Sequence, residues 1–299
     1  MFDYRRLIPG RAFRLFILKC LRPVPDRWML SLQYWLQLGR RPNLKSPSRF
    51  TEKIQLYKMN YRNPIMGECV DKYEVRGFVE RKGLGSILNN IYGVYDDADE
   101  IDFNSLPEKF VIKTTDGGGG NNVVICTDKS TLDIPQLRRR LNGWLNVKDI
   151  NPGREWAYTL IHKSRIIIEH YIEKSNSEEG RSGIEDFKIL CFGGEPRFVI
   201  VDVDRYVHHR RNIYDAEWNN LHVGTDCPQF DEDYPCPSNL AEMLAVARRL
   251  SEDVPFVRVD LYNVDGKIFF GEMTFYPWSG YVAFNPDSFD EELGALMNI

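Results

Sequence analysis

The segment "FVRVDLYNVDGKIFFGEMTFYP" (residues 256–277) constrains the fold of this chain most strongly. Two runs rich in β-branched and aromatic residues flank Asp265-Gly266, a dipeptide typical of two-residue turns in β-hairpins. A turn there pairs residues whose numbers sum to about 532, so Asp260 is expected opposite Glu272. Like charges directly across a ladder repel each other. The pattern therefore predicts an antiparallel hairpin with an acidic pair in an apolar setting.

A cation between the two carboxylates would remove their repulsion. Carboxylates with room for phosphate oxygens are hard ligands that suit Mg²⁺. The alternative is an acidic pair that faces solvent, but apolar residues occupy both faces of the predicted hairpin. Asp260 and Glu272 are therefore the predicted metal ligands.

The stretch "KFVIKTTDGGGGNNVVIC" (residues 109–126) places four glycines between two predicted strands. Glycine loses more backbone entropy on ordering than any other residue, so the run is either a flexible turn or a loop that closes over phosphate. Lys113 precedes the loop, and Lys188 lies in a second apolar strand. Backbone N–H groups, ammonium groups and a divalent cation together hold polyphosphates, which favours a nucleotide site. The sequence G-x-x-x-x-G-K-[ST] does not occur, so the site is not a P-loop.

The rest of the chain mixes helical and strand patterns. Helices are predicted over 27–39, 46–61, 70–82, 131–146 and 238–253, the last with Ser238 as its N-cap. A further hairpin is predicted to turn at Gly193-Gly194. The predicted fold class is α+β, with antiparallel hairpins dominating the C-terminal half.

Charge and cysteine content narrow the class of protein. A net charge of −4 argues against a nucleic-acid partner, and six cysteines without a C-x-x-C pair argue against zinc and against a secreted scaffold. We therefore expect a cytoplasmic protein. The basic, partly apolar residues 1–24 are too short to span a bilayer. They predict either an ordinary packed helix or a peripheral contact with an anionic membrane.

Together these features resemble the ATP-grasp superfamily, and most closely its TupA-like family of teichuronopeptide biosynthesis. The blocks that carry the resemblance span residues 50–290: "FTEKIQ", "VDKYEVR", "GVYDDADEIDF", "LPEKFVIKTT", "DFKILCF", "DRYVHHRRNIYD" and "FVRVDLYNVDGKIFFGEMTFYP". The resemblance implies an ATP-grasp fold, in which two α+β subdomains clamp ATP behind an N-terminal helical region. The expected units are 1–65 (helical) and 66–299 (ATP-grasp), the latter with a glycine-loop lid at about 108–172 and a metal-binding subdomain at 185–299.

The resemblance also assigns expected roles to individual residues. Lys188 would meet the transferring phosphate and Arg258 would stabilise the acyl phosphate, which makes these two the catalytic candidates. Residues 169–172 would face the adenine, and Glu173 would reach the ribose. The full set of expected ATP contacts is Lys72, Lys113, Gly117, Gly118, Gly119, Gly120, Glu169, His170, Tyr171, Ile172, Glu173 and Lys188. Thr274 stands where the superfamily usually has a metal-binding Asn, and its hydroxyl is the expected third ligand.

The implied reaction is ADP-forming ligation of a carboxylate to an amine through an acyl phosphate, with ATP and Mg²⁺ as cofactors. The implied carboxylate is a uronic acid of a surface polysaccharide, such as a capsule or O-antigen, and the implied amine is an amino acid or small amine. Arginines bind carboxylates bidentately and aromatic rings stack on sugars. The candidate substrate residues are Arg205, Arg210, Arg211, Trp278, Ser279 and Gly280.

Two other functions remain compatible with the sequence. "DVD" at Asp202–Asp204 matches the D-x-D pattern of a glycosyltransferase superficially, and Thr274 alone suggests a non-catalytic ATP-binding module. Nucleotide preference would distinguish the first alternative, and ATP turnover the second.

Overall fold

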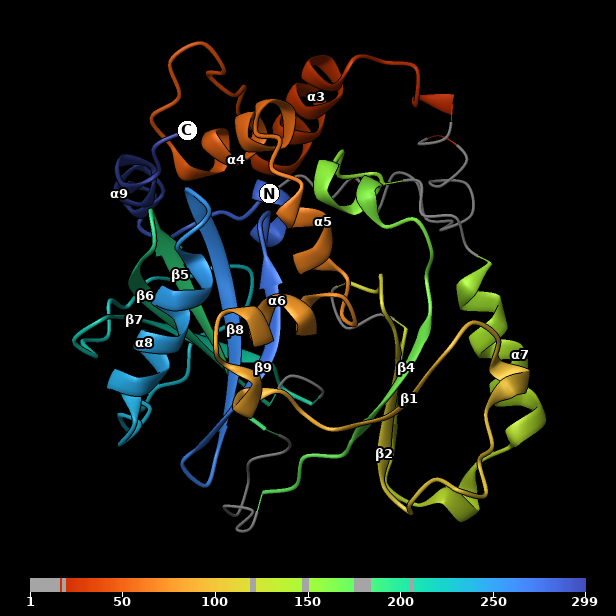
Figure 1. Ribbon diagram of the computed structural model, residues 1–299. Helices are drawn as coiled ribbons and strands as arrows, with labels where there is room; N and C mark the ends of the chain where they lie inside the picture. The colour runs from red at the N-terminus through yellow and green to blue at the C-terminus, as the bar shows by residue number, and fades with distance from the viewer. Residues whose placement is uncertain (1–16, 18–19, 119–121, 147–150, 175–183, 205–206) are drawn as a thin grey trace.

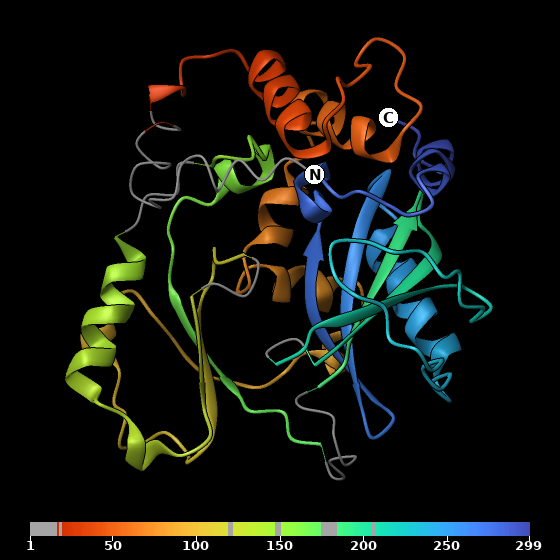
Figure 2. The ribbon, with the colours of Figure 1, turned by 180° about the vertical axis from the view of Figure 1, so that it is seen from behind.

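Two antiparallel sheets organise the chain in the computed structural model, which describes residues 17, 20–118, 122–146, 151–174, 184–204 and 207–299 (Figure 1). One sheet has four strands in the order β1-β4-β2-β3, and the other has five in the order β7-β6-β5-β8-β9. The two sheets stand side by side, and the views from front and back agree on this (Figures 1 and 2). The predicted α+β class is confirmed.

The five-stranded sheet consists of the two predicted hairpins and one additional strand. Its bounds are β5 Asp186–Phe192, β6 Glu195–Val203, β7 Arg210–Asp215, β8 Phe256–Val264 and β9 Lys267–Thr274. Both turns contain residues with positive φ, as tight hairpin turns require: Gly193, Gly194, Asp265 and Gly266. The register pairs Asp260 with Glu272, which confirms the pairing expected from the turn.

The four-stranded sheet holds the strands on either side of the glycine loop. Its bounds are β1 Ile91–Tyr95, β2 Phe110–Thr114, β3 Val123–Cys126 and β4 Ile166–His170. Helix α7 (Ile134–Leu145) covers the face turned away from the other sheet, and Asp133 caps it by accepting a hydrogen bond from the Gln136 N–H at 2.9 Å (Figure 2). Leu141 of α7 packs with Ile112 and Ile168 in a core separate from that of the five-stranded sheet.

Helices cover the top and one face of the five-stranded sheet. Their bounds are α3 Asp26–Leu38, α4 Phe50–Asn60, α5 Ile65–Val70, α6 Val75–Arg81, α8 Leu240–Ser251 and α9 Ser288–Leu296, with short 3₁₀ turns η1 Gly85–Ile87, η2 Ala98–Glu100, η3 Lys129–Thr131, η4 Trp156–Leu160 and η5 Pro277–Gly280. None of the helices within the described ranges has the length and apolar character needed to cross a bilayer. Most of residues 1–24, for which either a packed helix or a membrane contact is predicted, lie outside those ranges.

Two helix predictions were wrong in detail. The helix predicted over 70–82 begins only at Val75, as α6, because Asp71 Oδ1 accepts hydrogen bonds from the backbone N–H groups of Tyr73 and Glu74 at 2.8 and 2.9 Å. Such a turn competes with a continuous helix and places Lys72 in the connection. Asn239, not Ser238, stands at the N-cap of α8, and it makes no capping hydrogen bond through its side chain.

Helix α4 packs into the core of the five-stranded sheet. The Phe50 ring of α4 lies 5.0 Å from that of Phe256, and the Tyr57 hydroxyl donates to the Phe256 carbonyl at 3.0 Å. Residues 50–60 therefore share one hydrophobic core with β5–β9. The division of the chain into units at residues 65 and 66, and the subdomain bounds, stay predictions.

The C-terminal helix α9 packs closely against the backbone at the start of α4. A Cβ added to Gly294 of α9 would lie 2.0 Å from the Ser48 carbonyl oxygen and 2.8 Å from Phe50 N. Overpacking of this kind costs roughly 1–3 kcal/mol. We expect Gly294→Ala to lower the free energy of unfolding by about that amount, measured by denaturant titration.

A matched control is Gly143→Ala inside α7, where an added Cβ meets nothing within 4 Å. That change should instead stabilise the protein by roughly 0.5–1 kcal/mol, because glycine is a poor helix former. Equal effects of the two substitutions would contradict the close packing of α9.

Candidate functional site

One face of the five-stranded sheet gathers its charged side chains. Asp186 and Lys188 are two residues apart on β5, and side chains two apart in a strand share a face. The register places Asp202 opposite Asp186 and Asp260 opposite Lys188. Helix α8 lies on the other face, where the Cys191 thiol contacts the Ala247 carbonyl at 3.8 Å. The residues that share the charged face are Asp186, Lys188, Asp202, Arg258, Asp260, Glu272 and Thr274.

Lys188 lies at the centre of this face. Its ammonium donates to Asp186 and, at 3.1 Å, to Asp260 Oδ2, and it lies 3.7 Å from Asp202 Oδ2. These four side chains are at most 5% exposed. Breaking a buried ion pair by removing one partner costs several kcal/mol, so the cation and its carboxylates hold one another in place.

Arg258 forms a second cationic contact with the acidic pair. Its guanidinium binds Asp260 bidentately, with both nitrogen–oxygen distances at 2.7 Å. The same group donates to Glu272 Oε1 at 3.3 Å and to Thr274 Oγ1 at 3.1 Å. One guanidinium therefore contacts all three predicted metal ligands.

The acidic pair has the chemistry of a Mg²⁺ site. Burial raises the pKa of Asp260, the nearby Asp186 and Glu272 carboxylates add to this rise, and Arg258 and Lys188 oppose it. A divalent cation would favour the ionised form of such a carboxyl. Asp260, Glu272 and Thr274 offer hard oxygen ligands. In the described ranges no group of three or more His, Cys, Asp or Glu side chains is placed to hold a metal ion.

The four-stranded sheet contributes a second set of charges. Lys113 and Glu169 project from the face opposite the α7 core, and their side chains pair at 2.7 Å. Lys72 reaches the same region from the turn before α6, where its ammonium donates to the Gly117 carbonyl. Burial lowers the pKa of Lys72, and the Glu272 carboxylate of the other sheet opposes this shift. Lys72 thus lies where the two sheets face each other.

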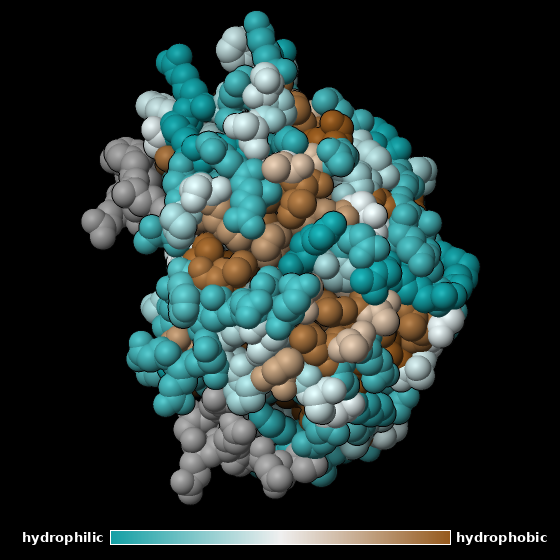
Figure 3. All heavy atoms as spheres, turned by 90° about the vertical axis from the view of Figure 1, so that its left-hand side faces the viewer, coloured by the Kyte–Doolittle hydropathy of each residue, from teal (hydrophilic) through white to brown (hydrophobic). Residues whose placement is uncertain are grey.

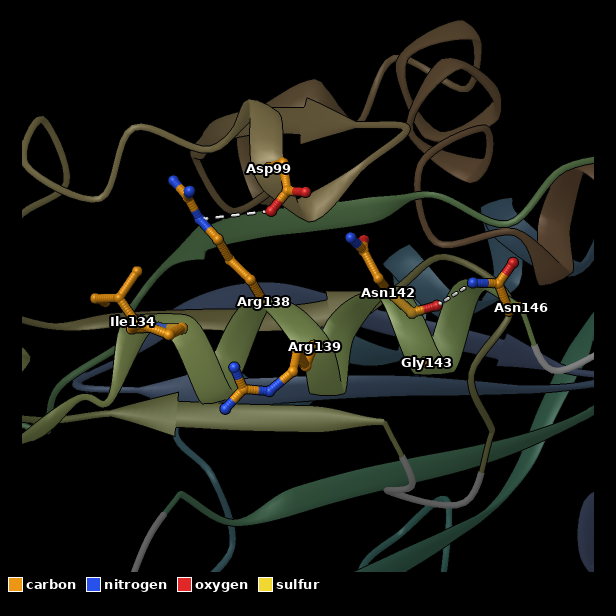
Figure 4. Close-up of a pocket in the computed structure, with 8 residues that line it drawn as sticks. Asp99, Ile134, Arg138, Arg139, Asn142, Gly143 and Asn146 are labelled. Atoms are coloured by element: carbon orange, nitrogen blue, oxygen red, sulfur yellow. Dashed lines mark hydrogen bonds and ion pairs between the residues drawn. The ribbon is translucent and has the colours of Figure 1, made fainter.

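A surface cavity of about 660 Å³ lies elsewhere, on the outer side of α7 (Figure 4). The Arg138 guanidinium projects there towards Asp99, and it already donates to the Ile101 carbonyl at 2.8 Å. No predicted site residue lines this cavity, so it is separate from the charged faces of the two sheets.

Comparison with known proteins identifies the family to which this arrangement belongs. A family model described as TupA-like ATPgrasp matches residues 52–298. The chain belongs to the TupA-like ATP-grasp family. The expected family and fold are therefore confirmed.

Solved structures similar to the TupA-like chain include two ligases. One is D-alanine–D-alanine ligase from Bacillus anthracis, with 18% identity over 70% of this chain and 57% of that chain, and a TM-score of 0.42. The other is L-amino acid ligase from Bacillus licheniformis, with 15% identity over 77% and 49% of the two chains, and a TM-score of 0.45. The TupA-like chain thus spans about half the length of these proteins. No curated protein matches it.

The glycine loop of the TupA-like protein is described only at its ends. Gly117 and Gly118 follow β2, and a Cβ added to Gly118 would meet nothing within 4 Å. Asn122 has a φ of 58° and its carbonyl accepts a hydrogen bond from Thr114 N–H at 3.3 Å. Gly119 and Gly120 lie outside the described residues.

The segment expected to face the adenine follows β4. The His170 N–H donates to the Asn90 carbonyl at 2.9 Å, and its own carbonyl accepts from Asn89 Nδ2 at 2.8 Å. Tyr171 and Ile172 come next and are half-buried. Glu173 pairs with Lys109 at 2.6 Å, so a ribose contact would have to replace this ion pair. The nucleotide roles of these residues stay predictions.

Two of the expected substrate arginines, Arg210 and Arg211, already have carboxylate partners. Arg211 lies within β7, not after a strand, and binds Asp202 at 2.6 and 3.1 Å and Asp226 at 2.6 Å. Arg210 pairs with Asp204 at 2.8 Å. Both aspartates of the "DVD" pattern are therefore in ion pairs within the protein. Arg205 lies outside the described residues.

The turn after β9 holds the other substrate candidates. Trp278, Ser279 and Gly280 all have positive φ. Trp278 is half-buried, with the Arg211 guanidinium 5.3 Å from its ring. A Cβ added to Gly280 would lie 2.4 Å from the Gln55 amide, which makes glycine necessary at this point. Substrate contacts by these residues stay predictions.

Lys58 and Glu155 are neighbours of this turn that the sequence analysis missed. The Lys58 ammonium donates to the carbonyl and to the hydroxyl of Ser279, both at 2.8 Å, and the hydroxyl donates to Glu155 at 2.5 Å. Burial lowers the pKa of Lys58 to about 8, and the Glu155 charge opposes the shift. The sequence did contain a signal for this contact: Lys58 lies three residues after Gln55, on the apolar and buried side of α4, where a lysine needs a polar partner.

The Asp202–Arg211 ion pair gives a test of the charged face. Burial acts to raise the pKa of Asp202, but hydrogen bonds from His209 and Arg211 and the Lys188 charge outweigh it, so this pKa lies well below its ordinary value. We expect Asp202→Asn to lower the free energy of unfolding by roughly 3–5 kcal/mol at pH 7.

The pH dependence follows from the direction of the shift. The Asp202 carboxylate stabilises the folded state above its unfolded pKa of about 3.9, and that contribution is lost as the pH falls below it. Unfolding measured between pH 3 and 7 should therefore show the gap between wild type and Asp202→Asn narrowing at the acidic end. A constant gap would mean that the carboxylate charge is not the stabilising element.

Proposed function

We propose that this protein is an ATP-dependent carboxylate–amine ligase that forms ADP. The observation that carries the proposal is the charged face of β5, β8 and β9, where Lys188 and Arg258 interleave with Asp260 and Glu272. Lys113 of the facing sheet and Lys72 of the turn before α6 complete a set of cations and carboxylates suited to a metal-bound triphosphate. Family membership supports ATP as the nucleotide and ligation as the reaction class.

The protein's own residues have distinct parts in this proposal. Lys72 and Lys113 would hold the phosphates from the lid side, and Asp260, Glu272 and Thr274 would hold Mg²⁺, which neutralises charge on the transferring phosphoryl group. Lys188 would contact that group, and Arg258 would stabilise the negative charge of the acyl phosphate. Their fixed positions in strands mean that little reorganisation is needed during reaction.

For the substrates, we propose a uronic-acid carboxylate of a surface polysaccharide or its precursor, and an amino acid or small amine. The resemblance to the teichuronopeptide family supports the carboxylate class. The half-buried Trp278 ring beside Arg211 offers a surface on which a sugar could stack. The amine and carboxylate would be joined with loss of one water and conversion of ATP to ADP and phosphate.

Glu272→Gln tests the proposed metal site. The Glu272 side chain is 39% exposed, so the substitution should leave the fold intact and lower ADP formation by at least roughly a hundredfold. Glu195→Gln is the matched control. Glu195 pairs with Arg248 of α8, so this substitution should leave turnover unchanged. Normal turnover by Glu272→Gln would show that the metal site is wrongly assigned.

Glu272 is a better test than Lys188. Lys188→Ala would also be expected to stop ADP formation, but it would remove the cation from three buried carboxylates. Loss of stability would then accompany any loss of activity.

The proposed reaction itself is tested by measuring ADP release from MgATP while uronic-acid glycosides are crossed with amino acids and small amines. We expect one pair to give ADP together with a product lighter than its two substrates by one water. If MgATP binds but none of the substrate pairs is turned over, the proposal that the substrates are small molecules would be contradicted. Failure to bind MgATP would contradict the proposed function as a whole.

A further inference from the structure

Helix α3 carries an apolar stripe that points away from the protein. Its inner side buries Met29, Leu30 and Tyr34. On the other side Trp28, Leu32 and Trp35 are 71%, 41% and 50% exposed. Their spacing of four and three residues places them on one line along the helix, and we call them the α3 stripe.

The α3 stripe concentrates exposed apolar surface. It holds three of the seven large apolar side chains that are exposed in the described residues, whereas the other four lie on separate elements. Figure 3 shows another face, on which apolar residues form two bands bordered by hydrophilic ones. Single exposed apolar residues are ordinary, but a clustered set with two tryptophans marks an interaction surface.

The charge of the chain is divided sharply around this helix. Residues 1–60 contain 13 Lys or Arg and 3 Asp or Glu, which gives a net charge of +10. Residues 61–299 contain the other 26 Lys or Arg and 40 Asp or Glu, which gives −14. Exposed Arg22 and Arg27 lie at the start of the stripe, and exposed Arg41 follows the helix. The stripe thus lies in the basic part of an acidic protein.

We propose that the α3 stripe docks on the surface of an anionic lipid bilayer. Tryptophan side chains favour the membrane–water interface, and arginines beside them are attracted to anionic headgroups. A second copy of the chain fits less well, because the exposed Arg22, Arg27 and Arg41 near one stripe would repel those near the other. The proposal does not depend on the reaction that the protein catalyses.

The docking surface is connected to the turn after β9. Gln33, on the inner side of α3, accepts a hydrogen bond from the Tyr281 hydroxyl at 2.7 Å and donates to the Pro152 carbonyl at 2.8 Å. Arg154 pairs with Asp26 at the start of the helix at 2.8 Å. The helix is therefore held to the segments around Ser279, and docking would bring the proposed substrate side towards the membrane.

Co-sedimentation of the full chain with lipid vesicles tests the proposal. We expect binding to phosphatidylglycerol-containing vesicles, little binding to pure phosphatidylcholine, and weakening when salt is raised well above ~0.1 M. Trp28→Ser/Trp35→Ser should lower the bound fraction on the order of tenfold, because binding scales with the apolar area that enters the interface. Both side chains are exposed, so thermal unfolding should stay unchanged.

Ile125→Ser/Val207→Ser is the matched control, because these side chains are 45% and 63% exposed on other elements. The control should bind vesicles as well as the wild type does. Three results would overturn the proposal: no binding by the wild type, equal binding by the tryptophan variant, or a concentration-dependent dimer of the wild type that the tryptophan variant does not form.

Discussion

The ammonium of Lys188 lies among three buried carboxylates, and much of the molecule is arranged around this contact. Asp186, Asp202 and Asp260 come from three neighbouring strands, each less than 5% exposed, and a desolvated cluster of like charges would not fold without a cation between them. The contact also fixes register, since a slip of one residue on any of these strands would turn its charge towards the α8 core. The sheet therefore has one face that packs against α8 and another on which the buried charges are gathered.

The second sheet faces this ionic surface with charges of its own. Lys113 and Glu169 pair on one face, while Ile112 and Ile168 point to the separate core under α7. Lys72 lies between the two sheets, because the turn at Asp71 directs its side chain to the carbonyl of Gly117, 45 residues further along the chain. The two hydrophobic cores are thus distinct, and both sheets contribute polar side chains to the region between them.

Local patterns predicted the parts of the site that depend on short stretches of chain. The turn at Asp265-Gly266 predicts the opposition of Asp260 and Glu272 to within one residue, and a register shift between Asp260 and Leu261 completes it. The shared face of Asp186 and Lys188 follows from their spacing. The partners of Arg211 could not be predicted, because Asp226 comes from the loop after β7 and only the fold brings it there. The same holds for Lys58, Ser279 and Glu155, which are joined across separations of 221 and 124 residues. The helix expected at 70–82 was right for residues 75–81 and wrong for its start, since a turn capped by the Asp71 side chain replaces the first helical turn.

The bidentate contact between Arg258 and Asp260 has a consequence for the order in which ligands arrive. A bare divalent ion approaching the acidic pair meets a guanidinium and an ammonium already bound there, and displacing them would leave two cations in a dry site. An ion that enters with its own phosphates brings new anionic partners for both cations. Entry of the two together therefore exchanges one set of anionic partners of Arg258 and Lys188 for another, whereas entry of the ion alone offers these cations no replacement.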